Sequence, residues 1–309
     1  MRLAAIDIGS NSIKVVVVEA AGRDSFNVLA SDREVVRLGQ ETLVYKHISD
    51  AAMLRAVDCL KRFRSLAEAH GAEQIVATAT AFLREADNAT EFVRVIEQKT
   101  GLRVEVIAGI EEARLIGLAA YHGCTERGVT SLNIDVGGGS TEISIFRDDE
   151  ALILHSIPIG AVGLTDRFIT CDPPSGNDLD QLRSVIRFTL GSWGIELLQR
   201  QIWETATATS GTAVTIAAIL NPTAPLEPTT LTLTELKKLN ENLAALPVLE
   251  RRKIPGLPPQ RADIIVAGGI ILEEVMSALR IEALRTCDWS LREGVIIDRL
   301  RRGTPKAWT

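Results

Sequence analysis

The chain has 309 residues and 46% of them are hydrophobic, enough to bury a sizeable core and to form two domains. Its formal net charge of -6 excludes a global positive field, so we expect neither nucleic acid nor a membrane as a partner. No secretion signal or membrane-spanning run is found, which predicts a cytoplasmic location.

The cysteines and histidines are scattered without the spacing of a metal site. No CxxC pair occurs, and the histidines are not placed as ligand pairs, which argues against zinc. The cysteine pattern is typical of a reducing compartment, in which these side chains are expected to be small core residues. The cysteines are Cys59, Cys124, Cys171 and Cys287.

The first half of the chain alternates β-branched runs with helical spacing. Apolar residues from Met53 to Ala67 recur every three or four positions and predict a helix. The expected elements are strands at 3–8, 13–18, 26–30, 75–80 and 104–107, and helices at 49–69, at 88–98 and from Glu111 onward.

The second half restarts the same pattern. Expected strands lie at 131–136, 141–146, 151–158 and 205–209, and expected helices at 178–192, 212–220, 234–245, 261–279 and 290–301. Proline-rich stretches at 221–228 and 255–259 predict surface loops.

The restart itself indicates a duplication. Residues 5–12 (AIDIGSNS) and 133–140 (NIDVGGGS) each place an aspartate late in an apolar strand, followed by glycine and small polar residues. We therefore predict an α/β protein of two related domains, 1–124 and 125–309.

These strand–turn–strand segments suit the binding of phosphate. Small residues let successive backbone N–H groups converge on an anion, and Ser10, Ser12, Ser140 and Thr141 can add hydroxyl donors. Asp7 and Asp135 fit beside phosphate if Mg²⁺ lies with them. A single Asp-x-Gly turn is usually only a hairpin, but two matched copies that could face one another are a strong signal.

Three other segments could take part in the chemistry. Glu112 is a carboxylate available to activate water, although acidic residues in a first helical turn also complement the helix dipole. Arg84 could offer a guanidinium fork to phosphate, and Ser210-Gly211-Thr212 joins a strand to a helix N-terminus. Either of these could also be only a surface arginine or a compact connection.

These motifs follow one another along the chain in the same order as in a known family. The chain resembles the Ppx/GppA phosphatases of the actin, sugar kinase and Hsp70 superfamily. The matching segments are 7–12, 79–88, 109–114, 135–142, 210–212, 261–265 and 290–294. The resemblance implies two duplicated actin-like (ribonuclease H-like) domains with a substrate cleft between them. It also implies Mg²⁺-dependent release of orthophosphate from inorganic polyphosphate or guanosine pentaphosphate, with Mn²⁺ as an alternative ion.

The resemblance also assigns roles to residues. Glu112 is similar to the catalytic glutamate of the family, and Asp135 and Glu142 to its acidic pair, which supports metal and water. Asp7 would be a further metal ligand from the first loop. The residues expected to bind phosphoryl groups are Ser10, Asn11, Ser12, Arg84, Gly137, Gly138, Gly139, Ser140, Thr141, Gly211 and Thr212.

Two departures from the family pattern affect the expected substrate. Gly163 stands where many relatives carry arginine, which removes one phosphate contact. The chain ends at Thr309, whereas longer relatives add helical domains, so we expect weak processivity and a preference for short polyphosphates.

Several functions stay open at this point. The catalytic motifs fit guanosine pentaphosphate as well as polyphosphate, and the aromatic content of 4% leans only slightly toward polyphosphate. A sugar or acid kinase of the same superfamily is less consistent with Glu112 and the serine-asparagine-serine loop. A sensor of polyphosphate or guanosine tetraphosphate without turnover is a further alternative. Family resemblance adds inhibition by guanosine tetraphosphate and a homodimer as expectations.

Overall fold

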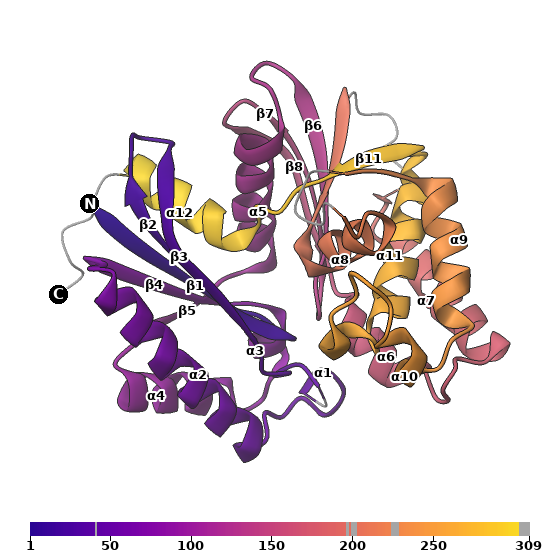
Figure 1. Cartoon of the computed structure of the whole chain (residues 1–309), viewed down its shortest axis with the longest axis horizontal. Coiled ribbons are helices and arrows are strands. Elements are labelled where there is room, and N and C mark those ends of the chain that lie inside the picture. The colour runs from indigo at the N-terminus through magenta and orange to yellow at the C-terminus, as the bar shows by residue number, and fades with distance from the viewer. Residues whose placement is uncertain (41, 196–197, 199–202, 224–228, 303–309) are drawn as a thin grey trace. The chain divides into compact units, whose positions relative to one another are not determined.

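The computed structural model describes residues 1–309 apart from 41, 196–197, 199–202, 224–228 and 303–309. The described chain forms two compact units (Figure 1). The first contains Met1–Ala119 and the residues from Trp289 onward, and the second contains Ala120–Asp288.

The first unit is built on a five-stranded sheet in the order β3-β2-β1-β4-β5. β1, β2 and β3 form an antiparallel meander, and β4 and β5 continue the sheet parallel to β1. The strands are β1 (Arg2–Ile8), β2 (Ser12–Ala20), β3 (Phe26–Val35), β4 (Gln74–Ala79) and β5 (Val104–Val106).

Helices cover both faces of this sheet. α2 (Asp50–Ala69) lies against β1 and β2 and also contacts α4 (Ala89–Thr100), while α12 (Leu291–Arg302) lies on the opposite face (Figure 1). The shorter helices α1 (Thr42–Tyr45) and α3 (Ala81–Glu85) follow β3 and β4 along the chain. α5 (Gly109–Cys124) begins in the first unit and ends in the second.

The position of α12 corrects the expected continuous domain 125–309. Its apolar side chains Val295 and Leu300 join a buried cluster with Leu3 and Val16 of the first sheet. Burying this apolar face against β1 and β2 is more favourable than leaving it in water. The first unit is therefore made from both ends of the chain.

The second unit has a six-stranded sheet in the order β10-β11-β9-β6-β7-β8. Its β8-β7-β6-β9-β11 portion repeats the order of the first sheet, with an antiparallel meander followed by parallel strands, and β10 is added at the edge. This agreement supports the predicted duplication. The strands are β6 (Thr130–Val136), β7 (Thr141–Arg147), β8 (Glu150–Ile157), β9 (Thr205–Thr209), β10 (Thr230–Thr232) and β11 (Ala283–Thr286).

α11 (Ile265–Leu279) is the central helix of the second unit. Thirteen of its residues are buried, because it contacts several other helices and β6. A helix that is apolar on all sides is typical of such a position. The other helices of this unit are α6 (Ala161–Phe168), α7 (Gly176–Ser192), α8 (Ser210–Leu220), α9 (Leu233–Ala244), α10 (Val248–Arg251) and the short 3₁₀ helix η2 (Pro259–Arg261).

Most predicted elements are present with small shifts at their ends. The expected helix at 261–279 starts instead with η2 and continues as α11 from Ile265. The sequence pattern did not indicate the short elements α1, α3, α6, α10, β10 and β11. The predicted loop at 255–259 is a turn region up to η2, and residues 224–228 of the other predicted loop lie outside the described chain.

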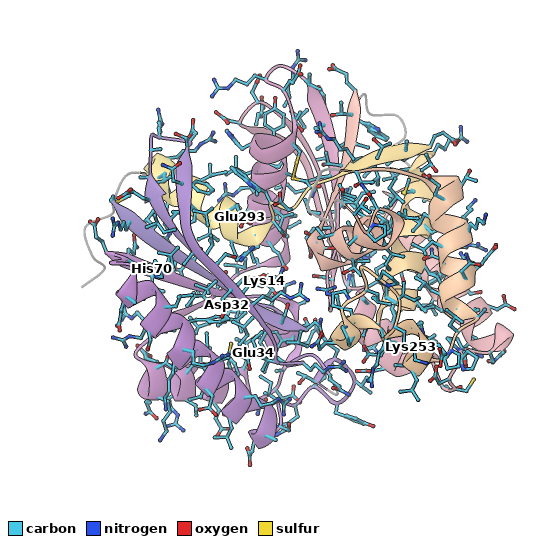
Figure 2. The ribbon with its side chains drawn as sticks, in the orientation of Figure 1. Lys14, Asp32, Glu34, His70, Lys253 and Glu293 are labelled. Atoms are coloured by element: carbon cyan, nitrogen blue, oxygen red, sulfur yellow. A yellow bond between two sulfur atoms is a disulfide. The ribbon has the colours of Figure 1, made fainter. Side chains whose placement is uncertain are left out.

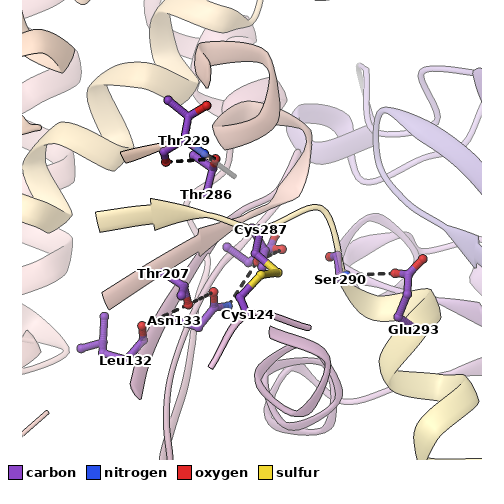
Figure 3. Close-up of a disulfide and its surroundings, with 11 residues drawn as sticks. Cys124, Leu132, Asn133, Thr207, Thr229, Thr286, Cys287, Ser290 and Glu293 are labelled. Carbon is purple, nitrogen blue, oxygen red and sulfur yellow. Dashed lines mark hydrogen bonds between the residues drawn. A yellow bond between two sulfur atoms is a disulfide. The ribbon is translucent and has the colours of Figure 1, made fainter. Parts of the chain in front are cut away.

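The cysteines differ from the prediction. Cys124 and Cys287 form a disulfide within the second unit, with a Cα–Cα distance of 6.2 Å (Figure 3). Cys59 is a buried free thiol, as expected, but Cys171 is exposed. The two bonded residues are 163 positions apart, and they meet only because β11 returns to the same sheet as β6.

None of the helices in the described part of the chain has the length and apolar character needed to cross a membrane.

Candidate active site

The first predicted loop is the turn between β1 and β2. The Gly9 N–H donates to the Ser12 carbonyl at 3.2 Å, which closes the turn. A neighbouring segment supports it, because Gly39 N–H donates to Ser10 O and Arg37 N–H to Asn11 O, at 2.6 and 2.9 Å. The loop backbone is thus held on two sides.

The side chains of this loop are polar and buried. Ser10, Asn11 and Ser12 are all at most 8% exposed. The Nδ2 atom of Asn11 is buried without an acceptor among the described residues. A buried donor without an acceptor is costly, and a phosphoryl oxygen would supply the missing acceptor.

Asp7 lies directly opposite Lys14 in the β1–β2 register. The Nζ atom of Lys14 is 3.5 Å from Oδ2 of Asp7, and both side chains are largely buried. Figure 2 shows Lys14 on the ribbon of the first unit. The negative charge of Asp7 therefore has a cationic neighbour within its own hairpin.

Glu112 lies in the first turn of α5 and is 7% exposed. Its Oε2 atom accepts a hydrogen bond from Nη1 of Arg84 at 2.8 Å, and the same Nη1 donates to the carbonyl of Ile107 at 3.0 Å. The structure thus brings together two residues that the sequence analysis selected separately. In this arrangement Arg84 fixes the position of the Glu112 carboxylate.

The glycine loop between β6 and β7 has the same turn as the first loop. The Gly137 N–H donates to the Ser140 carbonyl at 2.9 Å. The start of α6 supports the loop, since Ala161 N–H and Val162 N–H donate to the carbonyls of Gly137 and Gly138, each at 2.9 Å. With these carbonyls occupied, the N–H groups of the loop can turn toward an anion.

Gly160 lets α6 approach the glycine loop closely. A Cβ at position 160 would lie 2.5 Å from the carbonyl oxygen of Gly138 and from the nitrogen of Gly139. No side chain fits in that space. The shape of the loop therefore depends on a glycine outside the loop itself.

The predicted acidic pair is formed across this second hairpin. Asp135 lies opposite Glu142 in the β6–β7 register, and both are at most 4% exposed. Thr209 donates to Asp135 Oδ2 at 2.6 Å and Ser156 to Glu142 Oε1 at 2.8 Å. These hydroxyls orient the two carboxylates.

The two hairpins therefore differ at one matched position. Lys14 faces Asp7 in the first, and Glu142 faces Asp135 in the second. Like charges directly opposite each other are destabilising, so a cation suits the second hairpin better than the first. Paired carboxylates fit Mg²⁺, which commonly takes one or two of them with phosphate oxygens and water.

No group of three or more metal-ligating side chains is formed among the described residues. The predicted set Asp7, Asp135 and Glu142 is divided between the two units. The described geometry thus supports a two-carboxylate site, in which phosphate and water would supply the other ligands.

Thr141, Gly211 and Thr212 were also predicted to bind phosphate. The hydroxyl of Thr141 donates to Ile159 O at 2.7 Å, and that of Thr212 to Val136 O at 3.0 Å. These hydroxyls hold the second loop in place. Gly211 lies against the guanidinium of Arg261, so a Cβ there would displace the end of this side chain.

Four residues to which the sequence pattern assigns no role are brought to these loops by the structure. They are Lys14, Ser156, Thr209 and Arg261. Counting the register of each hairpin outward from its turn would have placed Lys14 opposite Asp7. Ser156, Thr209 and Arg261 come from distant segments, so only the folded sheet or packing reveals them.

Two units with one repeated sheet order, each carrying an acidic strand end and a tight small-residue turn, define a phosphate-binding type of protein with two related α/β domains. A family model described as Ppx/GppA phosphatase family matches residues 15–303, so the chain belongs to this family.

The relatives agree with this assignment. The chain is 31% identical over 304 residues to exopolyphosphatase 1 of Mycobacterium leprae, covering 97% of this chain and 90% of that protein. An exopolyphosphatase structure from Cytophaga hutchinsonii is 28% identical with a TM-score of 0.90, over 97% of this chain and 98% of the other. An Aquifex aeolicus Ppx/GppA family member is 26% identical with a TM-score of 0.81, over 99% of each chain.

These comparisons confirm the predicted family and the predicted α/β fold with two actin-like domains. They also confirm the prediction of a hydrolase acting on phosphoanhydride bonds.

Proposed function

We propose that this protein is an exopolyphosphatase that releases orthophosphate from the end of inorganic polyphosphate. The observation that carries this proposal is the second hairpin, where two buried carboxylates lie opposite one another beside the glycine loop. Relatives named exopolyphosphatase align along nearly the whole chain and support the same substrate.

The proposed cofactor is Mg²⁺, with Mn²⁺ as an alternative, held by Asp135 and Glu142. Bound there, the ion would neutralise charge on the phosphoryl oxygens. Asp7 is a proposed additional ligand, whose charge Lys14 already balances in part. Hydroxyl groups of Thr209 and Ser156 keep the two main carboxylates oriented for this role.

The proposed general base is Glu112, which would orient a water molecule and take its proton as the terminal phosphoanhydride breaks. Arg84 holds the carboxylate through one nitrogen and is proposed to bind a phosphoryl oxygen as well. Asn11, with Ser10, Ser12 and the N–H groups of Gly138 and Gly139, would bind phosphoryl oxygens. Most of the rate would come from positioning and charge neutralisation.

Guanosine pentaphosphate is the second candidate substrate, because it also ends in a phosphoanhydride. Guanosine tetraphosphate would then be an inhibitor, since it lacks that terminal phosphate. Only 4% of residues are aromatic, which gives a guanine few stacking partners and favours polyphosphate. A homodimer in the cytoplasm completes the proposal.

The test is orthophosphate release with Mg²⁺ from short polyphosphate, long polyphosphate, guanosine pentaphosphate and ATP. Glu112→Gln should lower release from polyphosphate at least about 100-fold. Glu85→Gln is the matched control, because Glu85 is exposed at the end of α3 in the same unit. Release from the pentaphosphate alone would replace polyphosphate as substrate, and binding without any release would indicate a sensor.

A further inference from the structure

The first turn of α5 is tied to the last helix of the chain by a charged network. Arg114 binds Glu111 through two hydrogen bonds of 2.7 Å, from Nε and Nη2. The same Nη2 donates to Oδ1 of Asp298 on α12 at 2.8 Å. The hydrogen bonds that Arg114 donates to Glu111, opposed by burial and aided by Asp298, raise the pKa of Arg114 above its ordinary value, so the guanidinium stays charged.

We propose that Asp298, acting through Arg114 and Glu111, is a positioning residue that sets the orientation of Glu112 for the reaction. The inference rests on the proposed role of Glu112 as the base. It deepens that proposal by naming a group that contacts none of the reacting atoms and yet controls the rate.

The geometry of α5 explains why such a tie is needed. The helix begins at Gly109, and the first turn of any helix has N–H groups without intrahelical acceptors. At this end of the helix the Glu112 N–H donates to Ala108 O, at 2.9 Å. Side-chain contacts therefore add to the backbone bonds that hold this turn about the helix axis.

The network holds one side of the turn, and Glu112 projects from another. Adjacent helical residues are about 100° apart around the axis. Glu111 turns toward Arg114 and Asp298, while Glu112 reaches Arg84 of α3. A small rotation that releases Glu111 would thus move the Glu112 carboxylate along an arc.

Packing makes α12 a firm reference point for this network. A Cβ at Gly294 would overlap the backbone carbonyl of Leu115, so the two helices touch at their backbones. Asp298 lies one turn further along α12 and its side chain is 14% exposed. Arg302 also binds Asp298, through Nε to Oδ2 at 2.9 Å, which limits the freedom of its carboxylate.

The neighbouring residue on α12 offers a matched control. Arg299 binds Glu105 of β5 at 2.8 Å, so this ion pair also anchors α12 to the unit. Neither partner contacts Glu111, Glu112 or Arg114 in the hydrogen bonds and ion pairs found among the described residues. Removing Glu105 therefore tests anchoring of α12 without touching α5.

The experiment compares Asp298→Ala with Glu105→Ala in full-length protein, using orthophosphate release from polyphosphate with Mg²⁺. We expect kcat of Asp298→Ala to be at least about fivefold lower than that of Glu105→Ala, with KM within about threefold of wild type. The proposal is overturned if kcat of Asp298→Ala is less than about fivefold below that of Glu105→Ala. It is also overturned if Asp298→Ala loses activity through a higher KM instead of a lower kcat. Asp298→Asn, which keeps the shape and removes the charge, replaces Asp298→Ala if that variant fails to fold.

Glu112→Gln in the same series separates the two proposals. If Glu112→Gln keeps wild-type activity, the assignment of the base fails and the inference fails with it. If Glu112→Gln loses activity while Asp298→Ala matches Glu105→Ala, only the positioning role is wrong.

Discussion

Arg84 and Glu112 are joined by a hydrogen bond of 2.8 Å from Nη1 to Oε2, although they are 28 positions apart and lie on different helices. The same nitrogen donates to the carbonyl of Ile107, so Arg84 is fixed to the chain just before α5. An arginine held in this way has a defined direction, which suits the role proposed for Arg84 in positioning both a carboxylate and a phosphoryl group.

Arg84→Gln should therefore lower kcat for orthophosphate release by about 100-fold, because one charged donor is removed from the reacting groups. Arg94→Gln is the control, since Arg94 lies on the exposed side of α4 and bonds only to Gln98 among the described residues. Steady-state rates of both variants on polyphosphate test this. Equal rates for the two variants would contradict the role of Arg84.

Gly160→Ala should reduce kcat/KM by about tenfold or more, because its Cβ must displace the backbone of Gly138 and Gly139. Gly191→Ala is the matched change, since a Cβ there meets nothing within 4 Å and the residue also lies in the second unit. Activity and thermal unfolding of both variants should be measured. A fully active Gly160→Ala would show that the loop shape is not critical.

The Cys124–Cys287 disulfide should stabilise the second unit by about 5 kcal/mol, because it closes a long loop in the unfolded chain. Adding reductant should lower the unfolding temperature of the wild type. It should leave a variant with alanine at both positions unchanged. An identical response of both proteins to reductant would argue against a disulfide.

Cys59 should not contribute to thiol reactivity. Burial, with a smaller effect from the negative charge of Asp32, raises the pKa of its thiol to about 12.

Acid should destabilise the second unit through Glu274. Burial opposes ionisation of this carboxyl, but hydrogen bonds from Arg187 and Arg183 outweigh it and hold its pKa below the ordinary 4.5. A carboxyl whose pKa is lower in the folded protein than in the unfolded chain stabilises the fold at pH values above its unfolded pKa. This contribution to stability is lost as the pH falls through its folded pKa.

The unfolding temperature should thus decrease as the pH is lowered from about 4.5. Glu274→Gln should make this decrease smaller, and it should lower the unfolding temperature at neutral pH by several degrees. Glu241→Gln, an exposed change on α9, should keep the wild-type pH dependence. Thermal unfolding across the acid range measures both. Parallel curves for Glu274→Gln and wild type would exclude this residue as the cause.

Much of the fold could be predicted because its signals are local. The strands carrying Asp7 and Asp135 are apolar runs that end at small-residue turns, and these fix β1, β2, β6 and β7 with little ambiguity. Short elements such as β11 (Ala283–Thr286) escaped prediction, because their few residues gain strand structure only by pairing with a distant neighbour.

The candidate site could be predicted as a set of residues but not as a geometry. The motifs indicated Arg84 and Glu112 separately, and their hydrogen bond depends on how α3 and α5 pack. The cysteines show the same limit, since a separation of 163 positions carries no local sign of pairing. The partners Thr209 and Ser156 also come from strands that only the sheet brings close to the acidic pair.

The placement of α12 has a consequence for how the protein is made. Synthesis completes the second unit, the continuous stretch Ala120–Asp288, before it completes the first unit, which also needs the residues from Trp289 onward. The apolar side chains of Leu3 and Val16 on the first strands therefore stay uncovered until the helix at Leu291–Arg302 has been synthesised and can pack on them. Nascent chains should therefore acquire protease resistance in the middle before they do at the beginning, and chaperones should bind the early strands during synthesis.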